Sequence, residues 1–323
     1  MNATLRILSP APATNAVTAA FDRFSAFQGV LHVAGYAFCA TQPVASLALR
    51  LADGAVRPLA RHDLPSPDLA RLHGNMAAAC AFDERLILGS EAGLGPGVHL
   101  EVRLADGSLH HVAYQGADPT DRMQALDARF FAMLKDRPPG HLLEIGSRAR
   151  TGTVRTDLLP PGWRYTGFDI MDGENVDIVG DAHAASSFLP LRSFDAVMSF
   201  VVFEHLLMPW KAVIEMNRVL KEGAIGLIMA PQSWPLHEEP CDYFRFSAHA
   251  WKALLNRATG FEIIEAAQGG RTYMVPHVLN PACHFGEAHV GALMSGVLFR
   301  KVSETSLDWP VSMADIAEDR YPF

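Results

Sequence analysis

Short apolar stretches, separated by turn-forming residues, run through the first third of the chain. GVLHVAGYAF (29–38), VASLALRLADG (44–54) and VHLEVRLADG (98–107) are apolar runs with interspersed polar positions. Such runs are typical of β-strands. Residues 1–25, rich in Ala, Pro and Thr, follow no such pattern, and PSPDLARLHG (65–74) indicates a long connection with room for one helical turn. The pattern predicts an all-β region.

Two of these runs end in the same Asp-Gly signal. Asp53-Gly54 and Asp106-Gly107 each lie between alternating segments, and an Asp-Gly pair in that setting is the strongest short signal for a β-hairpin. We therefore expect two hairpins within one small sandwich over residues 26–116, with residues 1–25 left unassigned.

A different periodicity begins near residue 117. Asp118 can cap a helix there, Pro119 suits its first turn, and PPG at 138–140 ends it. The apolar face of this helix is formed by Met123, Leu126, Phe130, Phe131 and Leu134.

From residue 141 onward, strand-like and helix-like segments alternate. The helices are expected at 209–223, which starts on a proline and ends at Gly223, and at 247–260, which Ser247 caps and Gly260 ends. This alternation predicts a mostly parallel sheet with helices on both faces and a ligand site at the carboxyl ends of its central strands. The expected strands are 141–146, 164–170, 176–182, 194–201, 224–231, 261–267 and 296–302.

Composition narrows the classes of partner. The chain has 323 residues, of which 49% are hydrophobic, so it is long enough for two domains with real cores. A net charge of −8 disfavours nucleic acid and acidic membrane surfaces as partners. The four cysteines show no CxxC spacing, which indicates reduced thiols and a cytoplasmic protein. Neither a membrane span nor a secretory signal is expected.

The motifs from residue 142 onward resemble those of class I S-adenosylmethionine-dependent methyltransferases, a Rossmann-like family with a seven-stranded sheet. LLEIG at 142–146 is followed by an acid after the second strand (Asp169) and by GDAH with Asp181 after the third. SFDAVMSFVVFEHLLMPW (193–210) and EMNRVLKEGAIGLIMAP (215–231) then come in the order of that family. The resemblance implies an α/β methyltransferase domain over 117–302, with a tail at 303–323.

The resemblance also implies S-adenosylmethionine as cofactor and gives several residues a role. Asp169 would accept hydrogen bonds from both ribose hydroxyls, with a solvated turn as the alternative. Asp181, with Ala182 beside it, would take the adenine amino group, with helix capping as the alternative. Glu144 would orient the methionine end, Gly146 would let the backbone approach the cofactor, and Phe200 also belongs to the cofactor site.

The glycine turn departs from a dinucleotide-binding turn. Between Gly146 and Gly152 lie Arg148 and Arg150, whereas a pyrophosphate needs several glycines around it. S-adenosylmethionine has no phosphate, so the turn favours a methyltransferase over a nicotinamide enzyme. Arg148 or Arg150 would pair with the methionine carboxylate, and Arg148 is the one assigned to the cofactor site; for at least one of them an exposed arginine at a helix start is the alternative. The first helix must be short, because only TVRTDLLPPG follows Gly152.

Two histidines are candidates for a base that takes a proton from an acceptor hydroxyl. His205 follows the fourth strand and His237 follows the fifth, and both have a suitable pKa range. For His205, a structural role at a helix start remains the alternative.

The loop PLHEEPCDYFRFS (235–247) admits three interpretations. In the first, His237 acts as the base and a polar acceptor is bound by the substrate candidates Glu238, Asp242, Tyr243 and Arg245. In the second, the loop is a lid. In the third, His237 and nearby acids bind a divalent metal ion. We assign no metal ligand.

The loop resembles those of methyltransferases from bacterial surface-glycan clusters. We therefore expect O-methylation of a sugar, a surface glycan or another small molecule, in polysaccharide biosynthesis, by a chain that forms a homo-oligomer. The alternative function is a catalytically inactive binding or assembly module.

Overall fold

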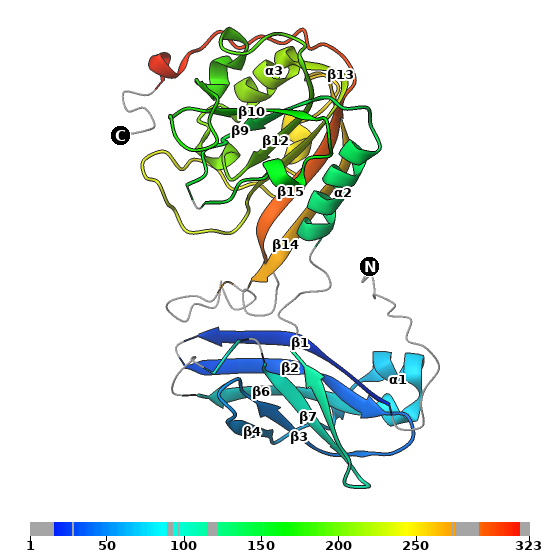
Figure 1. Cartoon of the computed structure of the whole chain (residues 1–323). Coiled ribbons are helices and arrows are strands. Elements are labelled where there is room, and N and C mark those ends of the chain that lie inside the picture. Colours follow the sequence, from blue (N-terminus) through cyan, green and yellow to red (C-terminus); the bar gives the residue numbers. More distant parts are fainter. Residues whose placement is uncertain are drawn as a thin grey trace. The chain divides into compact units, whose positions relative to one another are not determined.

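The computed structural model of the chain describes residues 16–27, 29–88, 93–95, 97–114, 122–150, 152–272, 274 and 291–316. It divides into two compact units, Met1–Ala117 and Asp118–Phe323 (Figure 1). Each unit is described by itself. No helix among the described residues is long and apolar enough to cross a membrane.

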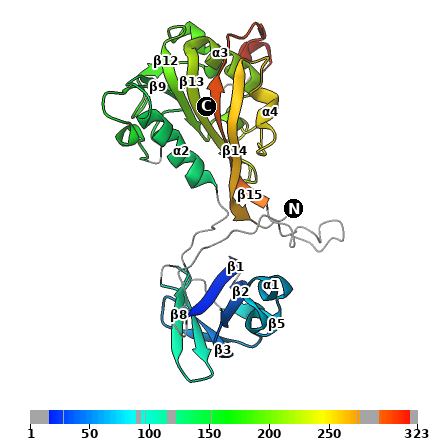
Figure 2. The same ribbon diagram turned by 90° about the vertical axis from the view of Figure 1, so that its right-hand side faces the viewer.

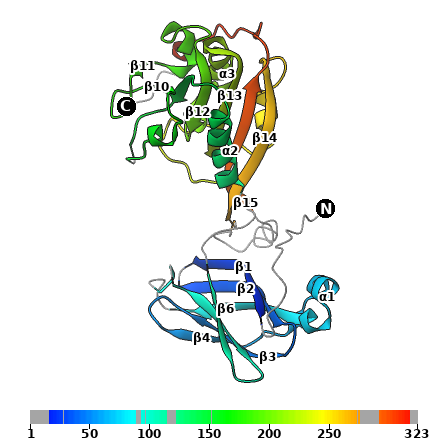
Figure 3. The same cartoon turned by 45° about the vertical axis from the view of Figure 1, so that its right-hand side comes forward.

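The N-terminal unit consists of two antiparallel four-stranded sheets. One sheet has the order β1-β2-β6-β5 and the other β4-β3-β7-β8. Figure 3 shows β1, β2 and β6 side by side. The strands are β1 (Val17–Phe27), β2 (Val30–Cys39), β3 (Val44–Arg50), β4 (Val56–Leu59), β5 (Leu64–Pro65), β6 (Ala79–Ile87), β7 (His99–Leu104) and β8 (Leu109–Ala113).

The buried core of this unit lies between the two sheets. Leu31 and Phe82 come from one sheet and Leu49 and Val102 from the other, and all four are almost fully buried. A double layer of this kind is a β-sandwich. The prediction of an all-β sandwich is confirmed.

Both Asp-Gly hairpins are present. β3 pairs with β4 across Asp53-Gly54, and β7 pairs with β8 across Asp106-Gly107. Each Asp accepts a hydrogen bond from the backbone two residues later, as Asx turns do. The sequence pattern failed to predict β1, which begins at Val17 inside the unassigned N-terminal segment, and helix α1 (Pro67–His73) occupies more of the expected connection than one turn.

The C-terminal unit is built on a seven-stranded sheet of order β11-β10-β9-β12-β13-β15-β14. All neighbours are parallel except the pairs that involve β15, which runs antiparallel to β13 and β14. This confirms the predicted Rossmann-like, mostly parallel sheet. The strands are β9 (His141–Ile145), β10 (Arg164–Asp169), β11 (Ile178–Val179), β12 (Phe194–Phe200), β13 (Leu220–Pro231), β14 (Phe261–Thr272) and β15 (Gly291–Lys301).

Helices cover both faces of this sheet. α2 (Met123–Lys135) packs with Leu142, Met198 and Leu227, while α3 (Pro209–Val219) and α4 (Trp251–Leu254) pack with the alternate residues of the same strands, such as Leu143 and Val197. Figure 2 shows α2 and α4 on opposite sides of the sheet. Strands buried on both sides explain the continuous apolar runs in the sequence. The expected apolar face of α2 is buried, whereas its expected cap, Asp118, lies outside the described residues.

Three helix predictions need correction. The described residues between β9 and β10, which omit residue 151, contain no α-helix, and their helical element is the 3₁₀ turn η2 (Thr156–Leu158) before the Pro160-Pro161 pair. α3 ends at Val219 rather than Gly223, because the buried Lys301 ammonium donates to the carbonyls of Asn217 and Leu220 and stops the helical ladder.

The helix expected at 247–260 is only the four-residue α4. Thr259 Oγ1 donates to the Leu254 carbonyl, and Asn256 Nδ2 donates to the carbonyls of Lys252 and Ala253. These side chains therefore take the acceptors that a longer helix would use for its backbone N–H groups.

Three of the cysteines, Cys39, Cys80 and Cys241, are free and buried. The fourth, Cys283, lies outside the described residues.

Candidate functional site

A pocket of about 840 Å³ lies where β9, β10 and β12 end. Ligand pockets span roughly 300–1,000 Å³, so this one has room for two reactants together. The predicted site residues that line it are Glu144, Gly146, Arg148, Asp169, Asp181, Ala182, Phe200, His205, His237, Glu238 and Tyr243. Asp242 and Arg245 are the two predicted residues that do not line it.

Gly146 is required by the shape of the turn after β9. Its φ is +80°, and a Cβ built there would lie 2.0 Å from Cγ2 of Val202. Only glycine combines that conformation with so close a contact. The backbone is thereby left open to the pocket at this point, as the sequence predicted.

Most of the backbone N–H groups in the rest of the turn are already used within the protein. The N–H of Gly146 donates to the Phe168 carbonyl, that of Ala149 to the Glu174 carbonyl, and that of Gly152 to the Ala149 carbonyl. Because no helix starts here, these donors are used within the protein. The side chains around the turn must therefore provide most of its polar contacts to a ligand.

Asp169, the last residue of β10, holds the turn and faces the pocket. Its Oδ2 accepts from the N–H of Arg148 and its Oδ1 from the N–H of Met171. An ionised carboxylate has about four acceptor positions, so it retains capacity for hydroxyl groups of a ligand. The predicted ligand role and the turn-forming role are therefore compatible.

Asp181 likewise has a structural contact and a place in the pocket. It caps the 3₁₀ helix η3 (Ala182–Ser187) through Oδ1, which accepts from the N–H of His183 and contacts His183 Nδ1 at 2.7 Å. Burial alone would raise the pKa of Asp181, but the hydrogen bonds from His183 outweigh it and lower that pKa. The carboxylate is thus an anion beside Ala182, with acceptor capacity on Oδ2.

The inner end of the pocket contains a buried polar group around Glu144. Glu144 Oε2 accepts from the Tyr165 hydroxyl at 2.6 Å, and Oε1 lies 3.5 Å from Nη1 of Arg155. Burial raises the pKa of Glu144, while Tyr165 and Arg155 act in the opposite direction. The Arg155 guanidinium also lies 3.7 Å from the centre of the Phe200 ring.

Arg155 and Tyr165 were not predicted from the sequence. Arg155 lies in TVRTDLLPPG, a segment from which only a short first helix was predicted, and Tyr165 lies near the start of β10 rather than at its carboxyl end. The only available signal was a cation close in sequence to the turn. The two arginines considered instead have other contacts: Arg148 Nη1 donates to Met171 Sδ, and Arg150 forms an ion pair with Glu238 at 2.6 Å.

His205 ends a short 3₁₀ helix, η4 (Phe203–His205), and lines the pocket. Its Nδ1 lies 2.7 Å from the carbonyl oxygen of Cys241. A carbonyl oxygen only accepts, so Nδ1 carries the hydrogen and the lone pair is on Nε2. Burial lowers the pKa of His205, so the ring is neutral at pH 7. A neutral ring with a lone pair on Nε2 is in the form of a base.

In His237 the hydrogen is also on Nδ1, but different acceptors hold it there. Its Nδ1 lies 3.1 Å from Asp242 Oδ2 and 3.3 Å from the Pro235 carbonyl, both of which accept. The rings of His205 and His237 are 4.8 Å apart, centre to centre, at 75°. The structure therefore brings together the two histidines predicted from separate loops.

Asp242 and Arg245 act behind His237 rather than on an acceptor. Arg245 donates to both oxygens of Asp242 at 2.6 Å, which lowers the pKa of Asp242 to about 2. Arg245 also donates to the carbonyls of Trp234 and Pro235. These contacts lie inside the loop and position His237, and neither residue lines the pocket, so a direct contact of Asp242 or Arg245 with the acceptor stays a prediction.

Glu204 was not among the site residues predicted from the sequence. It is fully buried beside His205. Oε1 lies 3.7 Å from His205 Nε2, and neither carboxylate oxygen has a hydrogen bond. Burial is the main cause that raises the pKa of Glu204 to about 7. Donor atoms of Glu204, His205 and His237 are also close enough to hold an ion. In the metal interpretation of the loop, Asp242 is a less suitable ligand because its carboxylate is already paired with Arg245.

Residues 143–228 match the family model described as a methyltransferase domain. This segment extends from β9 into β13 and includes Glu144, Asp169, Asp181 and His205. No curated protein matches the chain.

Two solved structures are similar to slightly more than half of this chain. An S-adenosylmethionine-dependent methyltransferase from Archaeoglobus fulgidus is 16% identical, with 56% of this chain and 94% of that one covered and a TM-score of 0.40. The YcgJ protein from Bacillus subtilis is 17% identical, with coverage of 56% and 99% and a TM-score of 0.39.

Proposed function

Because the C-terminal unit is a class I S-adenosylmethionine-dependent methyltransferase domain, we propose that it methylates a hydroxyl oxygen of a sugar, in a surface glycan or another small molecule. The observation that carries this proposal is the pair of imidazoles at the pocket rim, His205 and His237, each with its lone pair on Nε2. A hydroxyl needs such a base, since it loses a proton as its oxygen gains a methyl group.

The pocket residues fit the cofactor group by group. Asp169 and Asp181 offer carboxylate oxygens where the ribose and the adenine amino group would lie. Glu144 and Arg155 offer one charge of each sign for the ammonium and carboxylate of the methionine end. When bound, S-adenosylmethionine supplies an electrophilic methyl group on a positively charged sulfur.

The chain's own residues then position the acceptor and remove its proton. Nε2 of His205 or His237 would take the hydroxyl proton as the acceptor oxygen receives the methyl group and the cofactor leaves as the neutral thioether. Glu238 and Tyr243 also line the pocket, and their polar groups would suit an acceptor with several hydroxyls. Positioning of this kind can supply about 7–11 kcal/mol of the barrier.

We also propose a role in polysaccharide biosynthesis, because the loop that carries His237 resembles loops of glycan methyltransferases. A cytoplasmic location fits the free thiols of Cys39, Cys80 and Cys241. The family match does not favour the alternative of a catalytically inactive module.

The direct test supplies the cofactor with an isotopically labelled methyl group together with a panel of sugars, nucleotide-activated sugars and oligosaccharides. We expect labelled methyl ethers, identified by mass spectrometry and located on oxygen by fragmentation. The control is a second panel of compounds that carry amines or thiols in place of hydroxyls. Labelled products from that panel alone would refute the proposal.

We also expect Asp169→Ala to weaken S-adenosylmethionine binding by about 1.5–3 kcal/mol, because hydrogen bonds to a charged group are worth that much. The measurement is calorimetric titration of the full chain. Asp169→Asn keeps one oxygen acceptor and therefore one of the two backbone contacts of the turn, with Arg148 or Met171, while it removes the charge; its affinity should still fall. Unchanged affinity in both variants would remove Asp169 from the cofactor site.

A further inference from the structure

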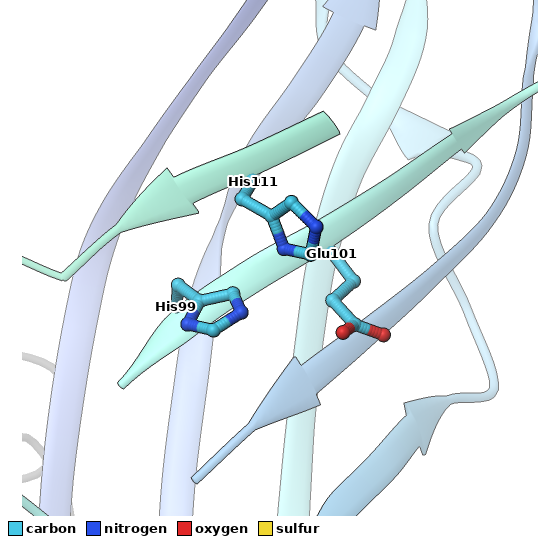
Figure 4. Close-up of side chains that lie close together, drawn as sticks. All are labelled: His99, Glu101 and His111. Carbon is cyan, nitrogen blue, oxygen red and sulfur yellow. The ribbon is translucent and has the colours of Figure 1, made fainter. Parts of the chain in front are cut away.

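A second group of chemically reactive side chains lies in the N-terminal unit, on the outer face of the sheet that contains β7 and β8. His99 and Glu101 are two residues apart on β7, and Glu101 is directly opposite His111 on β8. The alternate residues, Leu100 and Val102, point into the core of the sandwich. The three side chains therefore share one face of the sheet, as Figure 4 shows.

The donor atoms of this group are close together. One ligand atom from each of His99, Glu101 and His111 lies within 4.8 Å of the others. The two imidazole rings are 4.8 Å apart, centre to centre, at 72°. Small rotations of the exposed His111 side chain can shorten the separations, because nothing buries that ring.

Two neighbouring contacts orient the donors. Nδ1 of His99 lies 3.0 Å from the carbonyl oxygen of Gly97, so this nitrogen carries the hydrogen and the lone pair is on Nε2. Arg50 Nε donates to Oε1 of Glu101 at 2.6 Å, which holds the nearly buried carboxylate in place and leaves Oε2 for another partner. Metal-binding histidines and carboxylates have outer contacts of this kind.

We propose that His99, Glu101 and His111 bind a divalent transition-metal ion, with zinc as the reference ion. Two imidazole nitrogens and one carboxylate oxygen form a donor set that suits zinc and its neighbours and does not suit magnesium or calcium, which take oxygen ligands. Three protein ligands leave at least one coordination position open. The ion thus offers a Lewis-acidic position on the sandwich surface for water or an oxygen ligand.

The test is calorimetric titration of the metal-stripped full chain with Zn²⁺ alone. It is carried out in the His205→Asn background, which lacks one donor of the separate cluster in the C-terminal unit. We expect His99→Ala and His111→Ala each to weaken Zn²⁺ binding by more than the 10–100-fold typical of losing an outer contact. Replacement with Co²⁺ should give a visible absorption spectrum in the parent protein that both variants lose.

His62→Ala is the matched control, since His62 belongs to the same unit and lies outside the cluster. It should leave the affinity and the Co²⁺ spectrum unchanged, and Mg²⁺ should give no binding heat. Because His111 is exposed, its substitution should not unfold the sandwich, and circular dichroism checks this. Absence of Zn²⁺ binding to the parent, or equal affinity in parent and both variants, would overturn the proposal.

Discussion

Replacing His205 with asparagine should lower the rate of methyl transfer by about 10²–10⁴-fold while leaving S-adenosylmethionine binding unchanged. Asparagine can keep the hydrogen bond that the His205 Nδ1 makes with the Cys241 carbonyl, so the loop should retain its anchor. The base on Nε2 is lost. Single-turnover rates with the acceptor found in the labelling panel, together with cofactor titration, measure the two quantities separately.

The same substitution at His237 provides the comparison. Asparagine there can keep the donor toward Asp242 and Pro235 and removes only Nε2. The variant with the larger loss identifies the base, and His249→Ala, at an exposed position of the same unit, controls for removal of an imidazole. If both variants keep near-normal rates, positioning alone carries the reaction, and the acceptor is a better nucleophile than a sugar hydroxyl.

Glu204→Gln should change the dependence of stability on pH. In the folded chain the pKa of Glu204 is raised from 4.5 to about 7, chiefly by burial. The stability that this group contributes is therefore fully present below pH 4.5 and is lost as pH rises through about 7. At 1.36 kcal/mol per pKa unit, the change in the free energy of unfolding is about 3 kcal/mol.

Urea unfolding of wild type and variant between pH 5 and 8 measures this change. The buried amide of the variant lacks partners at every pH, so its cost lowers the variant's curve by a constant amount, while the fall in stability that ionisation of Glu204 causes in the wild type is absent from the variant. The curves of the two proteins should approach one another toward pH 8 or cross. Glu222→Gln, at an exposed carboxylate, should run parallel to wild type, and a parallel curve for Glu204→Gln as well would place the pKa of Glu204 near its ordinary value.

The architecture could be predicted because it depends on local signals. The Asp-Gly pairs at 53–54 and 106–107 fix hairpins by backbone conformation alone, and the apolar runs of β9, β12 and β13 show strands buried on both faces. β1 escaped prediction because its residues alternate weakly and it is held by pairing with β2. The end of α3 depends on Lys301, which is far away in the sequence and donates to the Asn217 carbonyl. The end of α4 depends on Thr259, whose hydroxyl takes the Leu254 carbonyl from the helical backbone.

The candidate site was predictable where a strand end determines it. Gly146, Asp169 and Asp181 follow from their positions after β9, β10 and β11, and all three line the pocket. The contacts of Arg155 and Arg245 were not predictable, since both depend on how irregular loops fold back onto the sheet. Sequence spacing alone does not distinguish a residue that touches a ligand from one that holds its neighbour.

The ion pair between Arg150 and Glu238 joins the turn on the cofactor side to the loop on the acceptor side. Any thermodynamic coupling that this bridge transmits must be reciprocal: the factor by which one reactant tightens binding of the other is the same in both directions. Both side chains are partly exposed, and such pairs are worth at most about 1 kcal/mol. Cooperativity through the bridge is therefore limited to about fivefold, and it should fade as added salt screens the two charges.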